Sequence, residues 1–352
     1  MLRIGIIGVS GYAGGELARL LMQHPAAKTT FVVSNTYKGK PLSAAFASMA
    51  GRTSLQCHGI EDIDLALEEC DVVFLAQENG FAMMHAQRFL SAGKKVIDLS
   101  ADFRLRDLNL YPAFYKFEHA TPTLLREAVY GLPELFRERV VGASLVANPG
   151  CYATGSALSV APLVAGKLID PATIVVNAMS GVSGAGRSKH NLTYHFPELN
   201  ENASAYAIAG SHRHTPEIEQ TLTDVAKAPI ALSFTPHLIP ITRGILVTAV
   251  ANLTEDTDAA ELLAIFRAYY EEKDPTGFVI VLGPGELPST KHTAGSNYVH
   301  IGLSVDARLR RVTVVAALDN LVKGAAGQAI QNMNLMAGLP ETSGLTMAGI
   351  WP

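Results

Sequence analysis

The chain has 352 residues, of which 48% are hydrophobic and 17% are charged, and its formal net charge is −4. This length predicts about two domains, and the composition excludes an intrinsically disordered chain. The small negative charge provides no basic surface of the kind that nucleic acids or anionic membranes attract, so we expect neither partner.

The cysteines indicate the compartment. Cys57, Cys70 and Cys151 are an odd number at irregular spacing, which argues against a disulfide framework and for a reducing compartment, the cytoplasm. We expect Cys57 and Cys70 to be structural. The sequence has no Cys-x-x-Cys or similar ligand spacing, so we expect no metal. It also has no run of about 18 apolar residues, so we expect no membrane span.

The first part of the chain alternates strand and helix patterns. Predicted strands cover 2–7, 29–33, 71–76 and 95–99, and predicted helices cover 16–23, 65–69 and 83–92. This alternation predicts an α/β domain, residues 1–150, with a doubly wound parallel sheet and right-handed crossovers.

The pattern changes after Cys151. Predicted strands cover 173–178, 230–234, 244–253, 277–282, 299–305 and 311–318, with helices at 157–164 and 259–272. We expect a second, α+β domain over residues 151–320, with a mostly antiparallel sheet. Residues 323–337, rich in Ala and Gly, predict a C-terminal helix, and this C-terminal segment, 321–352, should pack back on the first domain.

A glycine-rich turn joins the first strand to the first helix. Gly8, Gly11 and Gly14 are a variant of the dinucleotide fingerprint of Rossmann-type domains. Such glycines let the backbone approach a pyrophosphate at a helix N-terminus. We therefore expect the loop to bind a dinucleotide through Gly8, Ser10, Gly11, Tyr12, Ala13 and Gly14. The alternative is a tight turn without a ligand.

The end of the second predicted strand discriminates between cofactors. NAD sites usually carry an Asp or Glu there to hold the ribose hydroxyls, whereas the run from Ser34 to Lys40 has hydroxyls and two lysines but no acid. Such groups suit a 2′-phosphate, so we predict NADP(H), bound in part by Ser34, Thr36 and Lys38. The alternative for the lysines is a solvated loop.

Cys151 follows the turn-forming residues Asn148, Pro149 and Gly150, just before the predicted helix at 157–164. A helix N-terminus has free N–H groups and a partial positive charge, which favour a reactive thiolate and can hold an oxyanion. The alternative is a cysteine that only packs in the core.

A His-Arg-His run supplies proton-transfer groups. If the stretch before the helix that begins near Pro216 is extended, His212 and His214 share one side and Arg213 points away. Either histidine is a candidate acid or base for the thiol. The alternative is a structural histidine. A nucleotide site together with a reactive thiol predicts reduction through a thioester.

Two further segments suit anions. Small residues at 180–187 allow N–H groups, among them those of Ser183 and Gly184, to converge on an anion beside Arg187. The segment from Ser100 to Arg104 follows a predicted parallel strand, where open sheets bind ligands. The alternative for both is a surface loop.

Several motifs together carry a family resemblance. They lie at 11–17, 101–105, 130–134, 149–152, 180–187, 212–218, 234–240, 243–245 and 319–324. With them the chain resembles the N-acetyl-gamma-glutamyl-phosphate reductases. One departure is Ala153, where that family usually has proline.

The resemblance implies a glyceraldehyde-phosphate dehydrogenase-like fold, a homo-oligomer (tetramer or dimer), and NADPH-dependent reduction of N-acetyl-gamma-glutamyl phosphate to the 5-semialdehyde in arginine biosynthesis. It implies Cys151 as nucleophile, His212 as base and Asn320 at the cofactor. Candidates to bind the acyl-phosphate substrate are Arg104, Asn148, Arg187, His214 and Arg243.

Three other functions are alternatives to this reductase activity. An aminoadipyl-phosphate reductase of lysine biosynthesis uses a substrate one methylene longer, a difference that leaves little trace in sequence. A non-catalytic NADP-binding protein would not need Cys151, His212 and the arginines together. A cysteine hydrolase would not need the nucleotide site.

Overall fold

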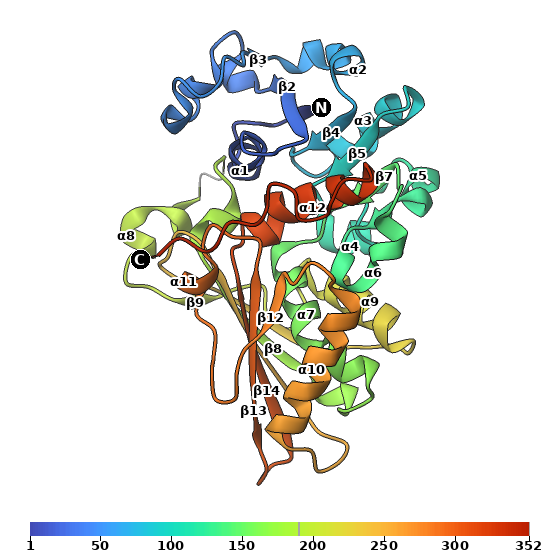
Figure 1. Cartoon of the computed structure of the whole chain (residues 1–352), viewed down its shortest axis with the longest axis vertical. Helices are drawn as coiled ribbons and strands as arrows, with labels where there is room; N and C mark the ends of the chain where they lie inside the picture. Colours follow the sequence, from blue (N-terminus) through green and yellow to red (C-terminus); the bar gives the residue numbers. More distant parts are fainter. Residues whose placement is uncertain (189–190, 352) are drawn as a thin grey trace. The chain divides into compact units, whose positions relative to one another are not determined.

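The computed structural model describes residues 1–188 and 191–351 (Figure 1). Its contacts form two compact units. The first contains Met1–Pro149, Gly186–Ser188 and Ala325–Thr346, and the other described residues form the second. The chain enters the second unit between Pro149 and Gly150, directly before Cys151.

The first unit contains a seven-stranded parallel sheet in the order β3-β2-β1-β4-β5-β7-β6. Its strands are β1 Leu2–Ile7, β2 Ala27–Val33, β3 Cys57–His58, β4 Val72–Leu75, β5 Lys95–Asp98, β6 Val129–Tyr130 and β7 Leu145–Ala147. The order runs outward in both directions from β1, which confirms the predicted doubly wound sheet. The strands β3, β6 and β7 were not predicted, because strands of two or three residues carry too little periodicity.

Helices pack on this sheet. They are α1 Tyr12–Leu21, α2 Ala66–Glu69, α3 Phe81–Ser91, α4 Leu110–Tyr115, α5 Pro122–Glu127, α6 Pro133–Val140 and α12 Gly327–Met336. Short 3-10 helices occupy η1 Asn35–Tyr37, η2 Leu42–Ala44, η3 Ala47–Met49 and η4 Ile60–Leu65. Strand residues such as Phe31 and Leu75 form one core cluster with Ala66 of α2 and Phe89 of α3. Alternation along the strands turns Ile6 and Val32, also buried, to the opposite face.

The C-terminal segment is helical close to where the sequence predicts it. A π-helical turn, η8 Val322–Ala326, leads into α12, which ends at Met336, so the two elements cover nearly the whole predicted helix at 323–337 and the rest of 321–352 is not helical. Gly338 has a φ of +68° and stops the helix. α12 contacts β5, α6 and α1. Several of its buried amides are paired, for example Asn332 Nδ2 donates to Gly131 O at 2.9 Å. The buried amide of Gln328 has no hydrogen-bond partner among the described residues.

The second unit contains a mixed sheet in the order β12-β13-β14-β11-β8-β10-β9. Its strands are β8 Val175–Ser180, β9 Ser204–Ala205, β10 Ser233–Leu238, β11 Ile245–Asn252, β12 Val279–Val281, β13 Val299–Asp306 and β14 Arg311–Leu318. Only the β12–β13 and β8–β10 pairs are parallel within this order, which confirms a mostly antiparallel sheet.

Helices cover one face of the second sheet, as Figure 1 shows for α7 and α10. The helices are α7 Cys151–Ala165, α8 Phe196–Leu199, α9 Thr215–Ala226, α10 Ala259–Lys273 and α11 Thr290–Thr293, with 3-10 turns η5 Pro171–Thr173, η6 Val182–Ala185 and η7 Leu192–Tyr194. Val176 and Ala178 of β8 are buried, whereas Val175 and Met179 on the other face are 38% and 41% exposed. None of the described helices is long and apolar enough to cross a membrane.

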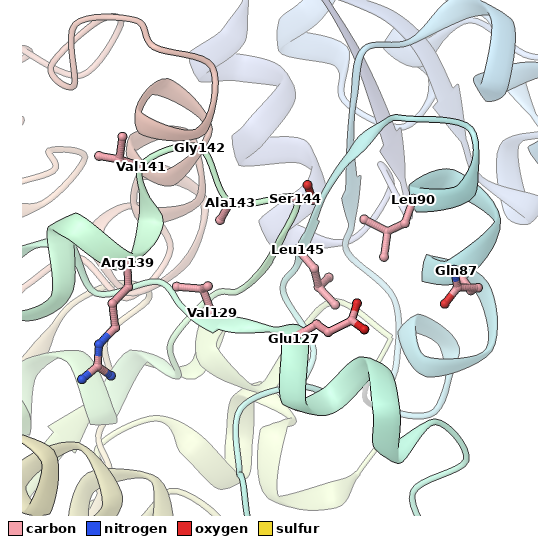
Figure 2. Close-up of a pocket in the computed structure, with 10 residues that line it drawn as sticks. All are labelled: Gln87, Leu90, Glu127, Val129, Arg139, Val141, Gly142, Ala143, Ser144 and Leu145. Atoms are coloured by element: carbon pink, nitrogen blue, oxygen red, sulfur yellow. The ribbon is translucent and has the colours of Figure 1, made fainter.

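A surface cavity of about 430 Å³ lies in the first unit (Figure 2). Its lining includes Gln87 and Leu90 of α3, Glu127 at the end of α5, and Arg139 of α6. It contains none of the residues that the sequence analysis assigned to a site, so it does not bear on the chemistry of Cys151.

Two carboxyl groups are fully buried at the carboxyl end of β5, that of Asp98, the last residue of the strand, and that of Asp102. Asp98 Oδ1 accepts the N–H of Ser100 at 2.8 Å. Asp102 accepts the N–H groups of Gly80 and Met83 at 2.7 and 3.0 Å, which caps α3. Burial and, secondly, the nearby charge of Asp102 raise the pKa of Asp98 to about 7, although Arg104 acts in the opposite direction.

The substitution Asp98→Asn should stabilise the protein in a pH-dependent way. Between about pH 4, the ordinary value for Asp, and pH 7 the carboxyl ionises in the unfolded chain but stays protonated in the fold. The wild type therefore loses stability as the pH rises through this window. Asparagine does not ionise, yet its Oδ1 can still accept from Ser100. The Tm of the variant relative to wild type should rise from pH 4 to 7 and then level off. A difference that does not change with pH would contradict this account.

Candidate active site

Cys151 is the first residue of α7, and Gly150 is its N-cap, with no side-chain capping bond. The thiol is partly exposed, whereas Cys57 and Cys70 are buried. Burial raises the pKa of Cys70 to about 11, so that group stays an unreactive thiol at neutral pH. Cys151 alone combines partial exposure with a helix N-terminus, which stabilises an anion there.

A buried carboxylate fixes the turn before Cys151. The N–H of Gly150 donates to Glu217 Oε1 at 2.7 Å, and Glu217 lies fully buried in the first turn of α9. The N-termini of α7 and α9 are thus tied together. The sequence analysis did not assign Glu217 a role, although an acid in the first turn after the His-Arg-His run was the available signal.

The His-Arg-His run is a turn and is not extended as the sequence analysis supposed. His214 is the N-cap of α9 in an αR conformation. His212 and His214 are nevertheless both buried while Arg213 is exposed, and the two imidazole centroids lie 4.9 Å apart. The turn therefore brings both rings to one side by a different backbone path.

The two histidines differ in hydrogen bonding. His212 Nδ1 accepts the backbone N–H of His214 at 3.0 Å. Burial and the charge of Arg213 lower the pKa of His212 to about 4, so its ring is neutral near pH 7. Because Nδ1 is an acceptor, the single proton of the neutral ring is on Nε2. His212 is thus set up as a donor at Nε2.

His214 lies closer to the start of α7. A Cβ on Gly150 would fall 2.5 Å from His214 Nε2, so only glycine leaves space for this ring. On another side, a Cβ on Gly324 would fall 2.8 Å from the Cβ of Cys151. The start of α7 is therefore packed by His214 and by the π-helical turn η8.

Two tyrosines support the histidine rings. Tyr206 donates its hydroxyl to that of Tyr152 at 3.2 Å, and Tyr152 donates to the carbonyl of His237 at 3.1 Å. The Tyr152 ring centroid lies 5.7 Å from that of His212 and 6.0 Å from that of His214. This aromatic packing, which the sequence analysis missed, restricts rotation of both imidazoles.

The glycine loop of the first unit fits a dinucleotide phosphate. Gly11 is the N-cap of α1 without a side-chain bond, and Tyr12 and Ala13 begin the helix. Gly8 has a φ of +100°, and a Cβ on Gly14 would fall 2.3 Å from Gly8 O. The loop therefore needs glycine at both positions, and the first-turn N–H groups of α1 suit an anion.

The segment that follows β2 contains no acidic residue, but a glutamate from η4 reaches it in the fold. Lys38 pairs with Glu61 of η4, and both side chains are exposed. This hydrogen bond and charge raise the pKa of Lys38. Ser34 is buried and donates to Ser10 Oγ at 2.7 Å, whereas Thr36 is exposed. Ser34, Thr36 and Lys38 thus follow one strand end, but Glu61 offsets the charge of Lys38.

Three other residues expected at the cofactor lie in the second unit. Asn320 Nδ2 donates to Ser183 Oγ at 2.9 Å, and Asn320 Oδ1 accepts from the N–H of Gly244 at 2.7 Å. Gly184 follows Ser183 within η6. The side chain of Asn320 therefore ties η6 to the start of β11.

The five residues expected at the substrate fall into separate groups. His214 and Arg243 lie in the second unit, where Arg243 Nη1 contacts the buried carboxylate of Asp319 at 3.1 Å and its side chain is 30% exposed. In the first unit, the buried Arg104 donates to the carbonyls of Leu99 and Asn148 at 2.9 and 2.8 Å.

Asn148 is also held by the backbone and by a neighbouring amide. Its Nδ2 donates to Ala325 O at 3.0 Å, and its Oδ1 accepts from Asn332 at 3.1 Å. Arg187 belongs to the first unit, against the fingerprint loop, where Nη1 donates to Ser10 O at 3.2 Å. Arg187 is thus grouped with the residues expected at the cofactor.

Family models match both parts of the chain. Residues 3–143 match the semialdehyde dehydrogenase, NAD binding domain, and residues 151–320 match the semialdehyde dehydrogenase, dimerisation domain. Among solved structures, the aspartate semialdehyde dehydrogenase II of Vibrio cholerae complexed with ASA has a TM-score of 0.74 at 16% identity, covering 96% of this chain and 98% of that one. The Candida albicans enzyme with NADP has a TM-score of 0.71 at 17% identity, covering 96% and 98%. These likenesses show the fold.

Curated relatives match at much higher identity. The N-acetyl-gamma-glutamyl-phosphate reductase of Symbiobacterium thermophilum is 53% identical over 348 residues, which cover 99% of this chain and 98% of the relative. The protein of the same name from Desulforamulus reducens is 48% identical over the full length of both chains. The chain therefore belongs to the N-acetyl-gamma-glutamyl-phosphate reductase family of semialdehyde dehydrogenases.

Proposed function

We propose that this chain reduces N-acetyl-gamma-glutamyl phosphate to N-acetylglutamate 5-semialdehyde and phosphate with NADPH, as a step in arginine biosynthesis. The observation that carries the proposal is the partly exposed Cys151 at the start of α7, with His214 packed against its N-cap. Full-length relatives at 46–53% identity share the reductase name. Three free cysteines among the described residues agree with a cytoplasmic enzyme.

The first chemical step is acyl transfer to Cys151. The thiolate sulfur attacks the acyl carbon, the bond from that carbon to the phosphate oxygen breaks, and phosphate leaves with its electron pair. The product is a thioester on Cys151, and the thiol proton is taken up by a base. NADPH, when bound, would supply a hydride to the acyl carbon of this thioester. The carbon–sulfur bond then breaks, which releases the semialdehyde and restores the thiolate of Cys151. Gly8, Gly11 and Gly14 with the start of α1 would hold the pyrophosphate of NADPH.

We assign different proton-transfer roles to the two histidines. The family motif implies His212 as the base, but in its neutral form its Nδ1 is taken by the N–H of His214 and its proton is on Nε2. His212 is therefore suited to donate a hydrogen bond to the carbonyl oxygen as that oxygen gains negative charge. His214, whose Nε2 faces Gly150, is suited to take the proton of Cys151. We assign the roles in this way.

Arg243 is our candidate for a substrate anion in the second unit. Asp319 fixes one side of its guanidinium at 3.1 Å, and part of the side chain stays exposed. Arg104 and Asn148 instead make the hydrogen bonds that join the ends of β5 and β7 to neighbouring backbone. We therefore assign these two residues to support of the fold.

The substitution Cys151→Ser should abolish the reaction but leave cofactor binding intact. The hydroxyl of serine does not ionise near neutral pH and contains no sulfur, so no thioester can form. We expect kcat to fall by at least about 10³-fold. NADPH oxidation and phosphate release are measured together, and the Kd of NADPH is measured by fluorescence. The control Cys57→Ser removes a buried thiol and should keep turnover.

The same assay separates the alternatives. A Cys151→Ser enzyme with wild-type turnover would exclude the thioester route. A wild type that binds NADPH but turns over neither acyl phosphate would favour a non-catalytic binding protein. Faster turnover of the aminoadipyl phosphate, which is one methylene longer, would favour the lysine-pathway reaction over the glutamyl one.

The donor role of His212 predicts unequal effects of two substitutions. The amide nitrogen of glutamine can take the position of Nε2, whereas asparagine is too short. We expect His212→Asn to lower kcat by about 10²–10³-fold, as for loss of an oxyanion donor. The decrease in kcat for His212→Gln should be smaller than that for His212→Asn by a factor of about ten or more. The Kd of NADPH should not change in either variant. Equal losses in the two variants would instead support His212 as a base.

We further propose that the chain forms a homo-oligomer through the open face of the second sheet. Val175 and Met179 of β8 lie on this face, and Met179 pairs in register with Leu246 of β11. A second copy of the chain would cover these apolar side chains. The dimerisation-domain model matches this same part of the chain, residues 151–320.

Introducing a charge on this face should dissociate the oligomer. Met179→Glu would bury a carboxylate against apolar residues, so the mass measured by light scattering should fall to that of one chain. The matched control Met84→Glu, on the exposed side of α3 in the first unit, should leave the mass unchanged. A wild type that is monomeric, or a Met179→Glu variant of wild-type mass, would contradict the proposed interface.

A further inference from the structure

Arg187 lies on the nucleotide side of the first unit although it follows the loop at 180–186. Its Nη1 donates to Ser10 O at 3.2 Å and to Ala45 O at 3.1 Å. Its Nη2 donates to the hydroxyl of Tyr37 at 3.4 Å. Ser10 belongs to the fingerprint loop, and Tyr37 lies just beyond β2. The side chain of Arg187 therefore joins the glycine-rich loop to the segment after β2, the two places where a Rossmann-type domain holds the pyrophosphate and the ribose of a dinucleotide.

Aromatic rings hold the guanidinium in place. Its central carbon lies 4.9 Å from the ring centroid of Phe46 and 5.9 Å from that of Tyr37. Such stacking orients an arginine before a ligand arrives, so less rotamer entropy is lost on binding. Among the described residues, three of its five N–H groups donate to the neutral oxygens named above, which leaves Nε–H and one Nη2–H for an anion.

The surroundings of Arg187 suit a phosphate at the end of β2. Ser34 is the residue after β2, at the position that normally reads the ribose, and it donates to Ser10 Oγ at 2.7 Å. The hydroxyls of Ser34, Ser10 and Tyr37 thus lie on the segments that Arg187 joins. Lys38 at the same strand end is paired with Glu61, so its charge is largely offset.

We propose that Arg187 binds the 2′-phosphate of NADP(H) and sets the preference for NADPH over NADH. This inference rests on the proposed cofactor and replaces our expectation that Arg187 binds the substrate. A guanidinium fork matches the oxygens of a phosphate in a bidentate geometry. NADH has no 2′-phosphate, so it cannot make this contact with Arg187.

The test compares two fragments that differ only in the 2′-phosphate. The Kd values of 2′,5′-ADP and 5′-AMP are measured by calorimetry on the full chain. Arg187→Ala should weaken 2′,5′-ADP by about 10–100-fold, as expected for loss of charge-assisted hydrogen bonds, and leave 5′-AMP unchanged. Arg187→Lys, which keeps the charge but not the fork, should lie between wild type and Arg187→Ala.

Two other variants calibrate the effect of charge alone. Lys28→Ala removes a positive charge at the opposite end of β2 and should change neither Kd by more than about twofold. Lys38→Ala should weaken 2′,5′-ADP less than Arg187→Ala does, because Glu61 already offsets that lysine. Retained 5′-AMP binding in every variant shows that the site is folded, and if Arg187→Ala does not fold, Arg187→Lys decides.

The outcomes separate this inference from the proposed function. An unchanged ratio of the two Kd values in Arg187→Ala and Arg187→Lys would overturn the inference alone. So would a raised KM for the acyl phosphate at saturating NADPH with unchanged 2′,5′-ADP binding, which would return Arg187 to the substrate. A wild type that binds neither fragment nor NADPH would contradict the proposed cofactor, and with it this inference.

Discussion

The hydrogen bond from Gly150 N–H to the buried carboxylate of Glu217 is the contact on which the catalytic centre depends. A buried carboxylate is stable only when it has donors, so Glu217 holds the N-cap of α7 against the first turn of α9. Two helix N-termini then meet, and one carries Cys151 while the other carries His214. Since both are part of regular helices, their separation is set by helix packing and not by loop conformation.

The histidine pair illustrates how identical side chains acquire different chemistry. The backbone N–H of His214 fixes the tautomer of His212, and burial with the nearby Arg213 keeps that ring neutral. His214 is set apart by its packing on Gly150, where any side chain would take its space. Tyr152 and the ring contacts around it limit rotation. The two rings can thus keep the different proton-transfer roles that we propose for them.

The first unit handles charge in a different way. Asp98 and Asp102 are both buried, and burial first, then the charge of Asp102, raises the pKa of Asp98 so that its carboxyl stays protonated in mildly acidic solution. At the end of β2, Lys38 is offset by Glu61, whereas the hydrogen bonds that Arg187 makes within the described residues all go to neutral oxygens. The positive charge at the proposed phosphate position therefore comes from Arg187. Its planar guanidinium, which stacks on aromatic rings, is held in one orientation, whereas a lysine side chain is flexible.

Features that depend on neighbouring residues could be predicted from the sequence alone. Strand and helix periodicity predicted both sheets, the glycine spacing predicted the loop before α1, and the turn before Cys151 predicted a helix N-terminus, because each is a local property of the backbone. The pairings of Lys38 with Glu61, Gly150 with Glu217, and Arg187 with Ser10 could not be predicted, because the partners are 23, 67 and 177 residues apart. No local pattern encodes such partners, since only the packed fold brings them within hydrogen-bonding distance.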